Sequence, residues 1–387
     1  PEEVQADGAI IAQLNTGPYS TTLSHPYGIA GDDVVKQSSL EGHRIGAIAV
    51  GPWQVDASLI DQPAPENLWT GQISGLVALR DSHLLSDAMV DAANANGFFT
   101  GFYTIRISKA GALHTLQSMM LEFNDDAGAA KAATEMAAVN NPDVGQPPGV
   151  PLQLPYRPDA SALSFAEADG STTVQAVVAH GRFVLLAAAR TAATYGIPAS
   201  GLAEQMLNTP LRALEGFEPT APSMRAALPM DPTGTLMAKT LWAPDNAAPF
   251  IVGVWDPHGW LHFEDNPVRA AAMFAEAGVD VVTQRLTTVY QTHSADAAAK
   301  LVDQFAADMA STTDIQPAAG VPGLPSAKCF VRDRGYELAD SAISWQRVYW
   351  RYKCVARADN FAFTAFSADD ADVHQRISAQ YRLLVGK

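Results

Sequence analysis

Apolar and polar positions along the chain follow two different periods, one typical of strands and one of helices. Gly97–Ser108 and Leu116–Phe123 are rich in aromatic and β-branched residues, a composition that is typical of strands. Ala127–Val139 and Ala295–Met309 are instead rich in alanine, the residue with the highest helix propensity, and predict helices. The chain therefore alternates between both kinds of element.

One stretch of the sequence occurs twice, once in each half of the chain. Leu121–Pro155 and Val289–Pro325 each contain a short apolar run, a polar pair, a helix with the sequence Ala-Ala-Lys, and a Gly-Val-Pro segment that ends in Leu-Pro. Asp125 or Asp126 in the first copy and Ser294 in the second stand where an N-cap residue is expected. The repetition predicts two related halves.

Paired apolar runs predict hairpins in both halves. Thr173–His180 and Arg182–Ala189 flank His180-Gly181, and Ser344–Val355 pairs with Asn360–Ser367 in the second half. Val279–Tyr290 is an apolar run that predicts one further strand. Strands of this kind, joined by short turns, indicate antiparallel sheets.

The second half also contains two predicted helices. Asn266–Ala277 is expected to begin at Asn266-Pro267 and to end before Gly278. The last helix of the chain is amphipathic, with one apolar face formed by Val373, Ile377, Tyr381 and Leu384. Strand, helix, hairpin and helix thus follow one another in both halves. This order predicts an α+β fold of two related domains, each an antiparallel sheet with helices packed on one face.

A proline-rich segment, Glu218–Pro232, is the predicted linker between the domains. We place the boundary within it, which gives an N-terminal domain of residues 1–222 and a C-terminal domain of residues 223–387. Either part is long enough to enclose a core of its own.

Composition excludes some partners. The 387 residues carry a formal net charge of -16, so a general electrostatic attraction to nucleic acid or to anionic lipid headgroups is not expected. No apolar run approaches the ~18 residues that a membrane span requires. The chain begins at Pro1, without an initiator methionine or a signal sequence, and we expect a processed protein.

Cys329 and Cys354 are the only cysteines, and each lies in or beside a predicted strand. They can form a disulfide or remain two buried thiols. A disulfide is the favoured interpretation; it would stabilise the fold by roughly 3 kcal/mol and indicate an oxidising compartment. Their spacing does not match a zinc or redox Cys-x-x-Cys motif.

The sequence lacks the nucleophile elbow, the zinc-protease motif, the P-loop and the dinucleotide fingerprint, so we predict no catalytic residue, no metal and no cofactor. Asp256–Asp265 combines two histidines with three carboxylates, a set of side chains that can bind a divalent metal. Gly259 and Pro257 favour a turn instead, with Trp255 and Trp260 packed inward.

Two sets of residues are candidates for ligand binding. Arg347, Arg351 and Lys353 alternate along one predicted strand with Tyr349 on the same face, which suits an anionic ligand or partner; a solvated surface is the alternative. An aromatic run beside Gly97 and Gly101 is expected to line an apolar groove or to pack in the core. It comprises Phe98, Phe99, Phe102 and Tyr103.

Several motifs resemble an actinobacterial, mycobacterial-type family of secreted lipoproteins of unknown function that carry the DUF7373 domain. They are the Asn15-Thr-Gly-Pro-Tyr-Ser-Thr-Thr stretch, Leu40-Glu-Gly-His-Arg, Gly51-Pro-Trp-Gln-Val-Asp and Gly278-Val-Asp. The second half is also similar to the extracellular sensor domain of PknH-type kinases. The resemblance implies a lipid-modified cysteine upstream of Pro1 and a position outside the plasma membrane, and it supplies no catalytic residues.

Together these features lead us to expect an exported cell-envelope protein that is not an enzyme and that binds an envelope lipid, a glycolipid or an envelope protein. An accessory subunit or scaffold of a membrane-associated complex, without a small-molecule ligand, is the alternative, and an unrecognised hydrolase is a third. A cavity would favour the first, an exposed apolar patch the second, and a nucleophile beside a base the third.

Overall fold

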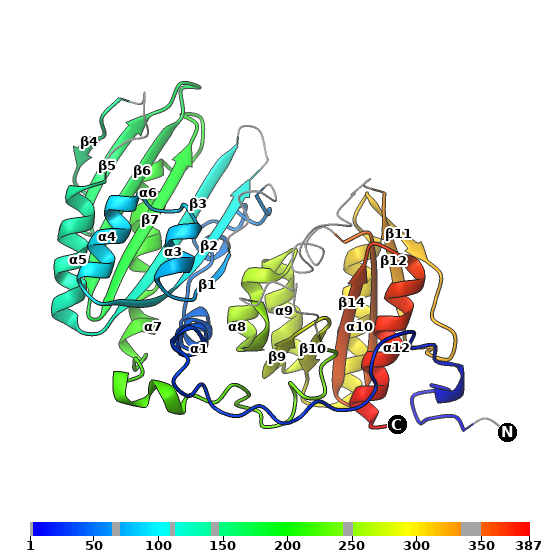
Figure 1. Cartoon of the computed structure of the whole chain (residues 1–387). Coiled ribbons are helices and arrows are strands. Elements are labelled where there is room, and N and C mark those ends of the chain that lie inside the picture. The colour runs from blue at the N-terminus through cyan, green and yellow to red at the C-terminus, as the bar shows by residue number, and fades with distance from the viewer. Residues whose placement is uncertain (1–2, 64–69, 109–112, 141–146, 243–250, 334–349) are drawn as a thin grey trace. The chain divides into compact units, whose positions relative to one another are not determined.

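The computed structural model describes residues 3–63, 70–108, 113–140, 147–242, 251–333 and 350–387. The chain divides into two compact units (Figure 1). The N-terminal unit consists of residues 29–228 and 258–268, and the C-terminal unit of residues 1–28, 229–257 and 269–387. Within the described chain, no helix combines the length and the apolar character that a membrane crossing needs.

A seven-stranded antiparallel sheet forms the centre of the N-terminal unit, with the strand order β1-β2-β3-β7-β6-β5-β4. Its strands are β1 (Gly71–Ile73), β2 (Phe98–Ser108), β3 (His114–Phe123), β4 (Val150–Leu152), β5 (Ser161–Ala166), β6 (Thr172–His180) and β7 (Phe183–Thr191). The predicted hairpin of β6 and β7 is confirmed, with His180 opposite Phe183.

Helices cover both faces of this sheet. One face carries α3 (Leu76–Asp81), α4 (Asp87–Ala95) and α5 (Asp126–Ala138), and the other α1 (Val34–Gly46) and α6 (Ala199–Asn208) (Figure 1). The remaining helices of the unit are short: α2 (Pro52–Val55), α7 (Leu211–Glu215), η3 (Pro222–Ala227), η5 (Leu261–Phe263) and most of α8 (Pro257–Trp260).

The C-terminal unit contains a second seven-stranded sheet, with the order β11-β12-β13-β14-β10-β9-β8. Its strands are β8 (Gly253–Trp255), β9 (Val281–Gln284), β10 (Thr288–Gln291), β11 (Ile315–Ala318), β12 (Lys328–Arg332), β13 (Tyr352–Ala358) and β14 (Phe361–Ser367). Helices α10 (Ala295–Ala310) and α12 (Asp370–Val385) lie on opposite faces of the sheet, and α9 (Pro267–Ala277) precedes β9 (Figure 1). A short 3-10 helix, η1 (Ile11–Gln13), lies in the N-terminal segment.

The two sheets have the same topology. Counted from the edge that holds β4 or β11, both place their strands in the chain order fourth, fifth, sixth, seventh, third, second, first. The prediction of two related α+β domains built on antiparallel sheets with packed helices is therefore confirmed. The helices extend the cover beyond the single face that we expected, because α1 and α6 in one unit, and α10 or α12 in the other, occupy the second face.

One backbone feature recurs at equivalent places in the two units. Gly97 follows α4 with a φ of 86°, and Gly278 follows α9 with a φ of 60°, in the left-handed region that favours glycine. A Cβ atom at Gly97 would lie 3.2 Å from the side chain of Asn124, and one at Gly278 would lie 2.5 Å from that of His293. Both positions therefore require glycine for conformation and for space.

The predicted caps are confirmed, whereas one predicted strand is wrong. Asp125 accepts a hydrogen bond from the backbone of Gly128, and Ser294 from that of Ala297. Val279–Tyr290 is not one strand but the hairpin of β9 and β10, in which Thr288 lies opposite Gln284. At the reversal, the backbone N–H of Arg285 donates to the carbonyl of Thr287, and the buried Arg285 side chain donates to the carbonyls of Met237 and Thr240.

The compact units divide the chain differently from the sequence-based boundary at 222/223, which falls inside η3. The first 28 residues belong to the C-terminal unit. Tyr19 donates to Asp372 on α12 at 2.5 Å and accepts from Arg376 at 3.0 Å. Tyr381, further along the same helix, donates to Asp7 at 2.7 Å. This N-terminal segment therefore contacts α12 through side-chain hydrogen bonds.

Residues 258–268 belong to the N-terminal unit, where a buried arginine holds them. The Arg106 side chain is 0% exposed. Its guanidinium donates to the carbonyls of His262 at 2.8 Å, Glu264 at 2.7 Å and Ile60 at 2.8 Å. The same group lies 5.5 Å from the ring centroid of Trp53. One side chain on β2 thus fixes two separate segments of backbone.

We expect Arg106→Met to lower the free energy of unfolding by about 3 kcal/mol or more, because several buried carbonyls lose a charged donor. Arg106→Lys should recover only part of the loss, since an ammonium group cannot reach carbonyls on both sides as a planar fork does. Arg80→Met, which removes an exposed ion pair, is the control and should cost at most about 1 kcal/mol. Urea unfolding checks this, and a near-neutral Arg106→Met would contradict it.

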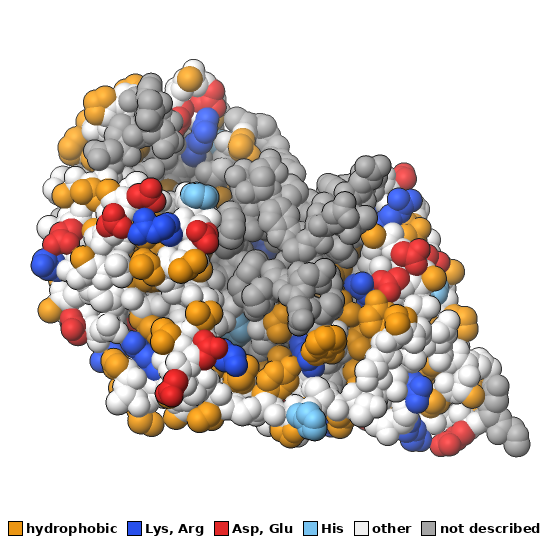
Figure 2. All heavy atoms as spheres, viewed as in Figure 1, with side chains coloured by type: hydrophobic (Ala, Val, Ile, Leu, Met, Phe, Trp, Pro, Cys, Tyr) orange, Lys and Arg blue, Asp and Glu red, His pale blue; other side chains and the backbone are white. Residues whose placement is uncertain are grey.

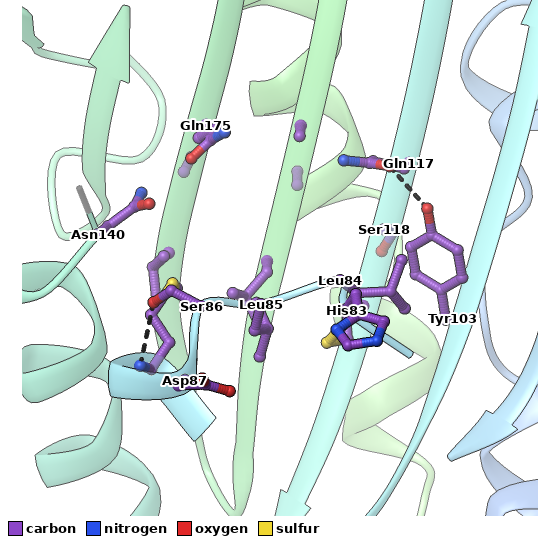
Figure 3. A pocket seen from close by; sticks show the side chains of 17 residues that line it. His83, Leu84, Leu85, Ser86, Asp87, Tyr103, Gln117, Ser118, Asn140 and Gln175 are labelled. Atoms are coloured by element: carbon purple, nitrogen blue, oxygen red, sulfur yellow. Dashed lines mark hydrogen bonds between the residues drawn. The ribbon is translucent and has the colours of Figure 1, made fainter. Parts of the chain in front are cut away.

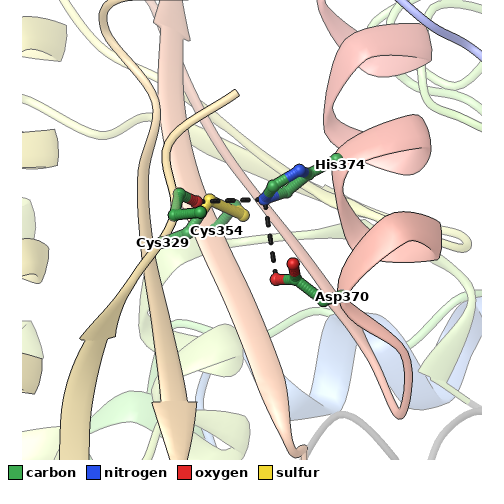
Figure 4. Close-up of a disulfide and its surroundings, with 5 residues drawn as sticks. Cys329, Cys354, Asp370 and His374 are labelled. Atoms are coloured by element: carbon green, nitrogen blue, oxygen red, sulfur yellow. Dashed lines mark hydrogen bonds and ion pairs between the residues drawn. A yellow bond between two sulfur atoms is a disulfide. The ribbon is translucent and has the colours of Figure 1, made fainter. Parts of the chain in front are cut away.

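The disulfide between Cys329 and Cys354 is present and joins β12 to β13 at directly opposite positions, with a Cα–Cα distance of 4.1 Å. Both cysteines are buried, at 4% and 0% exposure, in the core beneath α12. His374 of α12 lies beside them and contacts the carbonyl of Ala319 at 3.0 Å and Asp370 at 3.7 Å (Figure 4). The sulfur atoms are bonded to each other, so they offer no thiolate to a metal.

Replacing both cysteines by alanine should lower the free energy of unfolding by about 3 kcal/mol, since the unfolded chain then gains the entropy that the cross-link removes. A dithiol reductant should cause a similar loss in the wild-type protein and none in the variant. Denaturant unfolding with and without reductant measures both. Equal stability of the variant and the oxidised wild type would show that the cross-link contributes nothing.

Candidate functional site

A groove of about 470 Å³ lies on the face of the N-terminal sheet that carries α3, α4 and α5 (Figure 3). Its floor begins with four cross-strand neighbours from β2, β3, β7 and β6, all of them buried. These are Tyr103, Met119, Leu186 and Val177. Because side chains alternate along a strand, all four point to the same face. The floor of the groove is therefore built mainly from apolar side chains, although little of their surface is accessible and most of the accessible lining is polar.

The next row of side chains on the same face of the sheet has a polar residue at each end. Gln117 of β3 and Gln175 of β6 both lie opposite Ala188 of β7, so the small alanine separates two amides. Tyr103 donates its hydroxyl hydrogen to the amide oxygen of Gln117 at 2.6 Å (Figure 3). Burial raises the pKa of Tyr103, so the phenol stays protonated and remains a donor. Tyr103 thereby fixes the orientation of the Gln117 amide.

The connection between α3 and α4 forms one wall of the groove. Leu84 and Leu85 are half-buried there, and Ser86 caps α4 by accepting from the backbone of Met89 at 3.2 Å. His83 has a φ of 55°, which is uncommon for a residue other than glycine. Asn140, just after α5, lines the groove near Gln175 (Figure 3). The result is a hollow of small-molecule size with an apolar base and a polar margin, in which Asp87 is the one carboxylate among the described lining residues.

The family of the chain follows from comparison with protein-family models. The model for the N-terminal part of the domain of unknown function DUF7373 matches residues 30–230, and the model for its C-terminal part matches residues 236–387. The chain belongs to the DUF7373 family. The match to the N-terminal model includes every described residue that lines the groove.

Further comparisons add little to this DUF7373 assignment. No curated protein matches the chain. Among solved structures, the extracellular domain of PknH from Mycobacterium tuberculosis is similar, with 12% sequence identity and a TM-score of 0.31, over 46% of this chain and 97% of that domain.

The aromatic run that we singled out in this DUF7373 chain divides between the two faces of β2. Tyr103 lines the groove, whereas Phe102 is 1% exposed and packs against the ring of His262, with centroids 4.9 Å apart. Phe98 is half-buried and meets Phe123 edge to face at 6.1 Å. Phe99 is buried with the guanidinium of Arg225 3.5 Å from its ring centroid. Three of the four residues therefore pack in the interior.

The predicted cationic row lies only partly within the described residues. Arg347 and Tyr349 fall outside them. Arg351 is exposed just before β13, and Lys353, half-buried within β13, has its ammonium 5.8 Å from the ring centroid of Trp350. The row remains a prediction for an anionic partner.

The histidine-rich segment 256–265 does not form a metal centre among the described residues. His262 is buried and contacts the hydroxyl of Thr104 at 2.8 Å and the carbonyl of Ala49 at 3.1 Å. Burial holds the pKa of His262 well below its usual value, so its ring is neutral. Trp255 and Trp260 are fully buried, as the predicted inward packing requires.

A second polar cluster lies in the interior of the N-terminal unit, where it fastens the connector at residues 218–227. Glu41 of α1 accepts from the backbone N–H of Thr220 at 2.8 Å and pairs with Arg44 at 2.8 Å. Glu122 of β3 lies 4.0 Å from the guanidinium of Arg225. Both carboxyl groups are 0% exposed, so the cluster is closed to a substrate and its role is structural.

Burial, together with the neighbouring carboxyl of Glu41, raises the pKa of Glu122 to about 8, although Arg225 and Arg182 oppose the shift. Since the folded-state pKa is above the unfolded value, the protonated group stabilises the fold below about pH 4.5, and this contribution is lost as the pH rises through 8. The protein should lose stability over this range.

Glu122→Gln should remove this dependence, because the amide cannot ionise. Relative to the variant, the wild type should lose on the order of 3–5 kcal/mol of unfolding free energy between pH 5 and pH 8. Urea unfolding at several pH values measures the difference. Glu215→Gln, at the exposed end of α7, is the control, and its unfolding free energy should change with pH as that of the wild type does. If the unfolding free energies of Glu122→Gln and the wild type changed with pH in the same way, Glu122 would not be protonated in the folded protein.

Sequence reasoning missed Gln117, Gln175 and Asn140. A signal was present, because Gln117 and Gln175 interrupt apolar strands at positions where the alternation places a core residue. Their proximity depends on β7 lying between β3 and β6, and neither strand's own sequence records that pairing.

Proposed function

We propose that this DUF7373 protein is an exported cell-envelope protein that binds a lipid or glycolipid in the groove of its N-terminal unit and does not convert it chemically. The groove is the observation that supports this proposal. Its volume of about 470 Å³ falls in the range of small-molecule sites, and its base combines apolar side chains with a few polar groups. Such a lining suits an amphiphilic ligand.

The proposed location rests on two further observations. The buried disulfide between Cys329 and Cys354 favours an oxidising compartment, because cytosolic thiols are kept reduced. The motifs described above resemble those of secreted lipoproteins, and we propose attachment to the outer side of the plasma membrane by a lipid-modified cysteine upstream of Pro1. Nucleic acid is not a proposed partner, since the chain carries a net charge of -16.

A second candidate function is that of an accessory subunit or scaffold that binds another envelope protein. It is favoured by apolar side chains that are exposed near the start of α1. Ile29, Val34, Val35 and Met224 are 60%, 64%, 62% and 58% exposed. Backbone hydrogen bonds from Ala30 to Leu228 and from Gly31 to Ala226 hold the two segments side by side. Apolar side chains exposed on neighbouring segments can form a docking site. Figure 2 shows that hydrophobic side chains reach the surface at several places on one face of the molecule.

We expect protein purified from its own host to release a stoichiometric lipid or glycolipid on denaturation, seen by native mass spectrometry followed by organic extraction. Ala188→Phe should abolish this, because the ring fills the space between Gln117 and Gln175. Ala130→Phe, on the exposed side of α5, adds the same group outside the groove and should retain the ligand. If the wild-type protein carries no lipid and co-purifies with another protein, the lipid-binding proposal is wrong and the scaffold function is favoured.

A further inference from the structure

We infer that the groove recognises an uncharged, hydroxyl-rich ring of the saccharide type, either as a free sugar or as the head of a glycolipid. This inference rests on the proposed ligand-binding function and deepens it, because it assigns the chemistry of the group that the polar row contacts.

The described lining contains no permanently cationic side chain, which argues against an anionic ligand. Its one basic group is the imidazole of His83, which is exposed on the wall of the groove. No arginine or lysine is among the described residues that line the groove. A phosphate, sulfate or carboxylate would have to leave water there without a counter-charge, which is unfavourable. An anionic head is therefore disfavoured.

A cationic head is disfavoured as well. Asp87 is the one carboxylate among the described lining residues, and its side chain is 84% exposed, in the first turn of α4, where it pairs with Arg80 at 3.4 Å. Its charge is thus directed to solvent and already compensated. The aromatic ring of Tyr103 is 3% exposed, so its face is not open to a cation. A ligand without charge loses the least solvation in this groove.

The polar groups that do line the groove match hydroxyl groups. Gln117, Gln175 and Asn140 each carry an amide that both donates and accepts, as a hydroxyl does. The Tyr103 hydroxyl occupies the Gln117 oxygen, so the Gln117 NH₂ group is left to donate. Within the described residues the amides of Gln175 and Asn140 make no side-chain hydrogen bond to protein. Two neighbouring hydroxyls of a sugar can satisfy one such amide as donor and acceptor together.

The spacing of the amides suits a single ring. Gln117 and Gln175 lie on β3 and β6, with β7 between them, so their backbones are about 10 Å apart. Ala188 lies between the two and leaves the intervening space open. The adjoining row of Met119, Leu186 and Val177 is almost fully buried and forms the floor beneath the ring. The more accessible polar row would therefore supply most of the contacts with the ring.

The test uses the full chain and a series of probes that share an octyl chain and differ in the head. The neutral probes are octyl glucoside, octyl galactoside and octyl mannoside; the charged ones are octyl phosphate and octyltrimethylammonium. Titration calorimetry below the micelle concentration gives affinities, and saturation-transfer NMR shows which protons contact the protein. We expect at least one neutral glycoside to bind at least tenfold more tightly than either ion, with the strongest transfer to ring protons.

Variants localise the binding. Gln117→Met and Gln175→Met keep the length of the side chain and remove its hydrogen bonds, so each should weaken the glycoside about threefold to tenfold. Gln205→Met, on the exposed side of α6, is the matched control and should have no effect. Methyl glycosides separate the two sources of the ring. Binding as tight as that of the octyl glycosides indicates a free saccharide, and binding only of the octyl forms indicates a glycolipid.

Each failure has a distinct meaning. If the three kinds of head bind equally through the octyl chain, the saccharide inference is wrong and the proposed lipid-binding function stands. Tighter binding of an ion, or glycoside binding that neither Gln117→Met nor Gln175→Met weakens, also overturns the inference. If none of the probes binds and host-purified protein carries no ligand, the proposed function fails together with it.

Discussion

The buried guanidinium of Arg106 is the interaction on which the N-terminal unit depends most. A fully buried guanidinium is stable only when its N–H donors have hydrogen-bond acceptors. Here the carbonyls of Ile60, His262 and Glu264 are those acceptors. The arginine belongs to β2, so the central sheet itself dictates where these two backbone segments lie. His262 and Trp53 then fill the space next to it, and Phe102 becomes core instead of surface.

Both units have the same strand order, and the row that holds Gln117 and Gln175 lies in the N-terminal unit. The face of the C-terminal sheet that corresponds to the groove carries α9 and α10, where Tyr290 of β10 packs against Phe274 and Phe305. The disulfide lies on the opposite face, beneath α12. The similarity between the units therefore lies in their topology, their helix caps and the two glycines with positive φ, Gly97 and Gly278, whereas the side chains on their sheets differ.

Local signals in the sequence were sufficient for much of the fold. Three correct predictions depend on residues near in sequence or on adjacent strands. They are the helix caps at Asp125 and Ser294, the neighbouring strands, and the pairing of Cys329 with Cys354. What failed depends on distant contacts. Val279–Tyr290 contains a turn at which the side chain of Arg285 donates to carbonyls more than forty residues away. The groove was missed because strand order, rather than any motif, brings Gln117 and Gln175 together.

The place of the first 28 residues has a consequence for how the protein is made. Asp7 and Tyr19 are synthesised long before their partners Tyr381, Asp372 and Arg376, which lie in α12. The C-terminal unit therefore cannot close until α12 has been synthesised, whereas the strands of the N-terminal unit emerge much earlier. Until then the N-terminal segment lacks its hydrogen-bond partners, and the C-terminal unit is assembled late in synthesis.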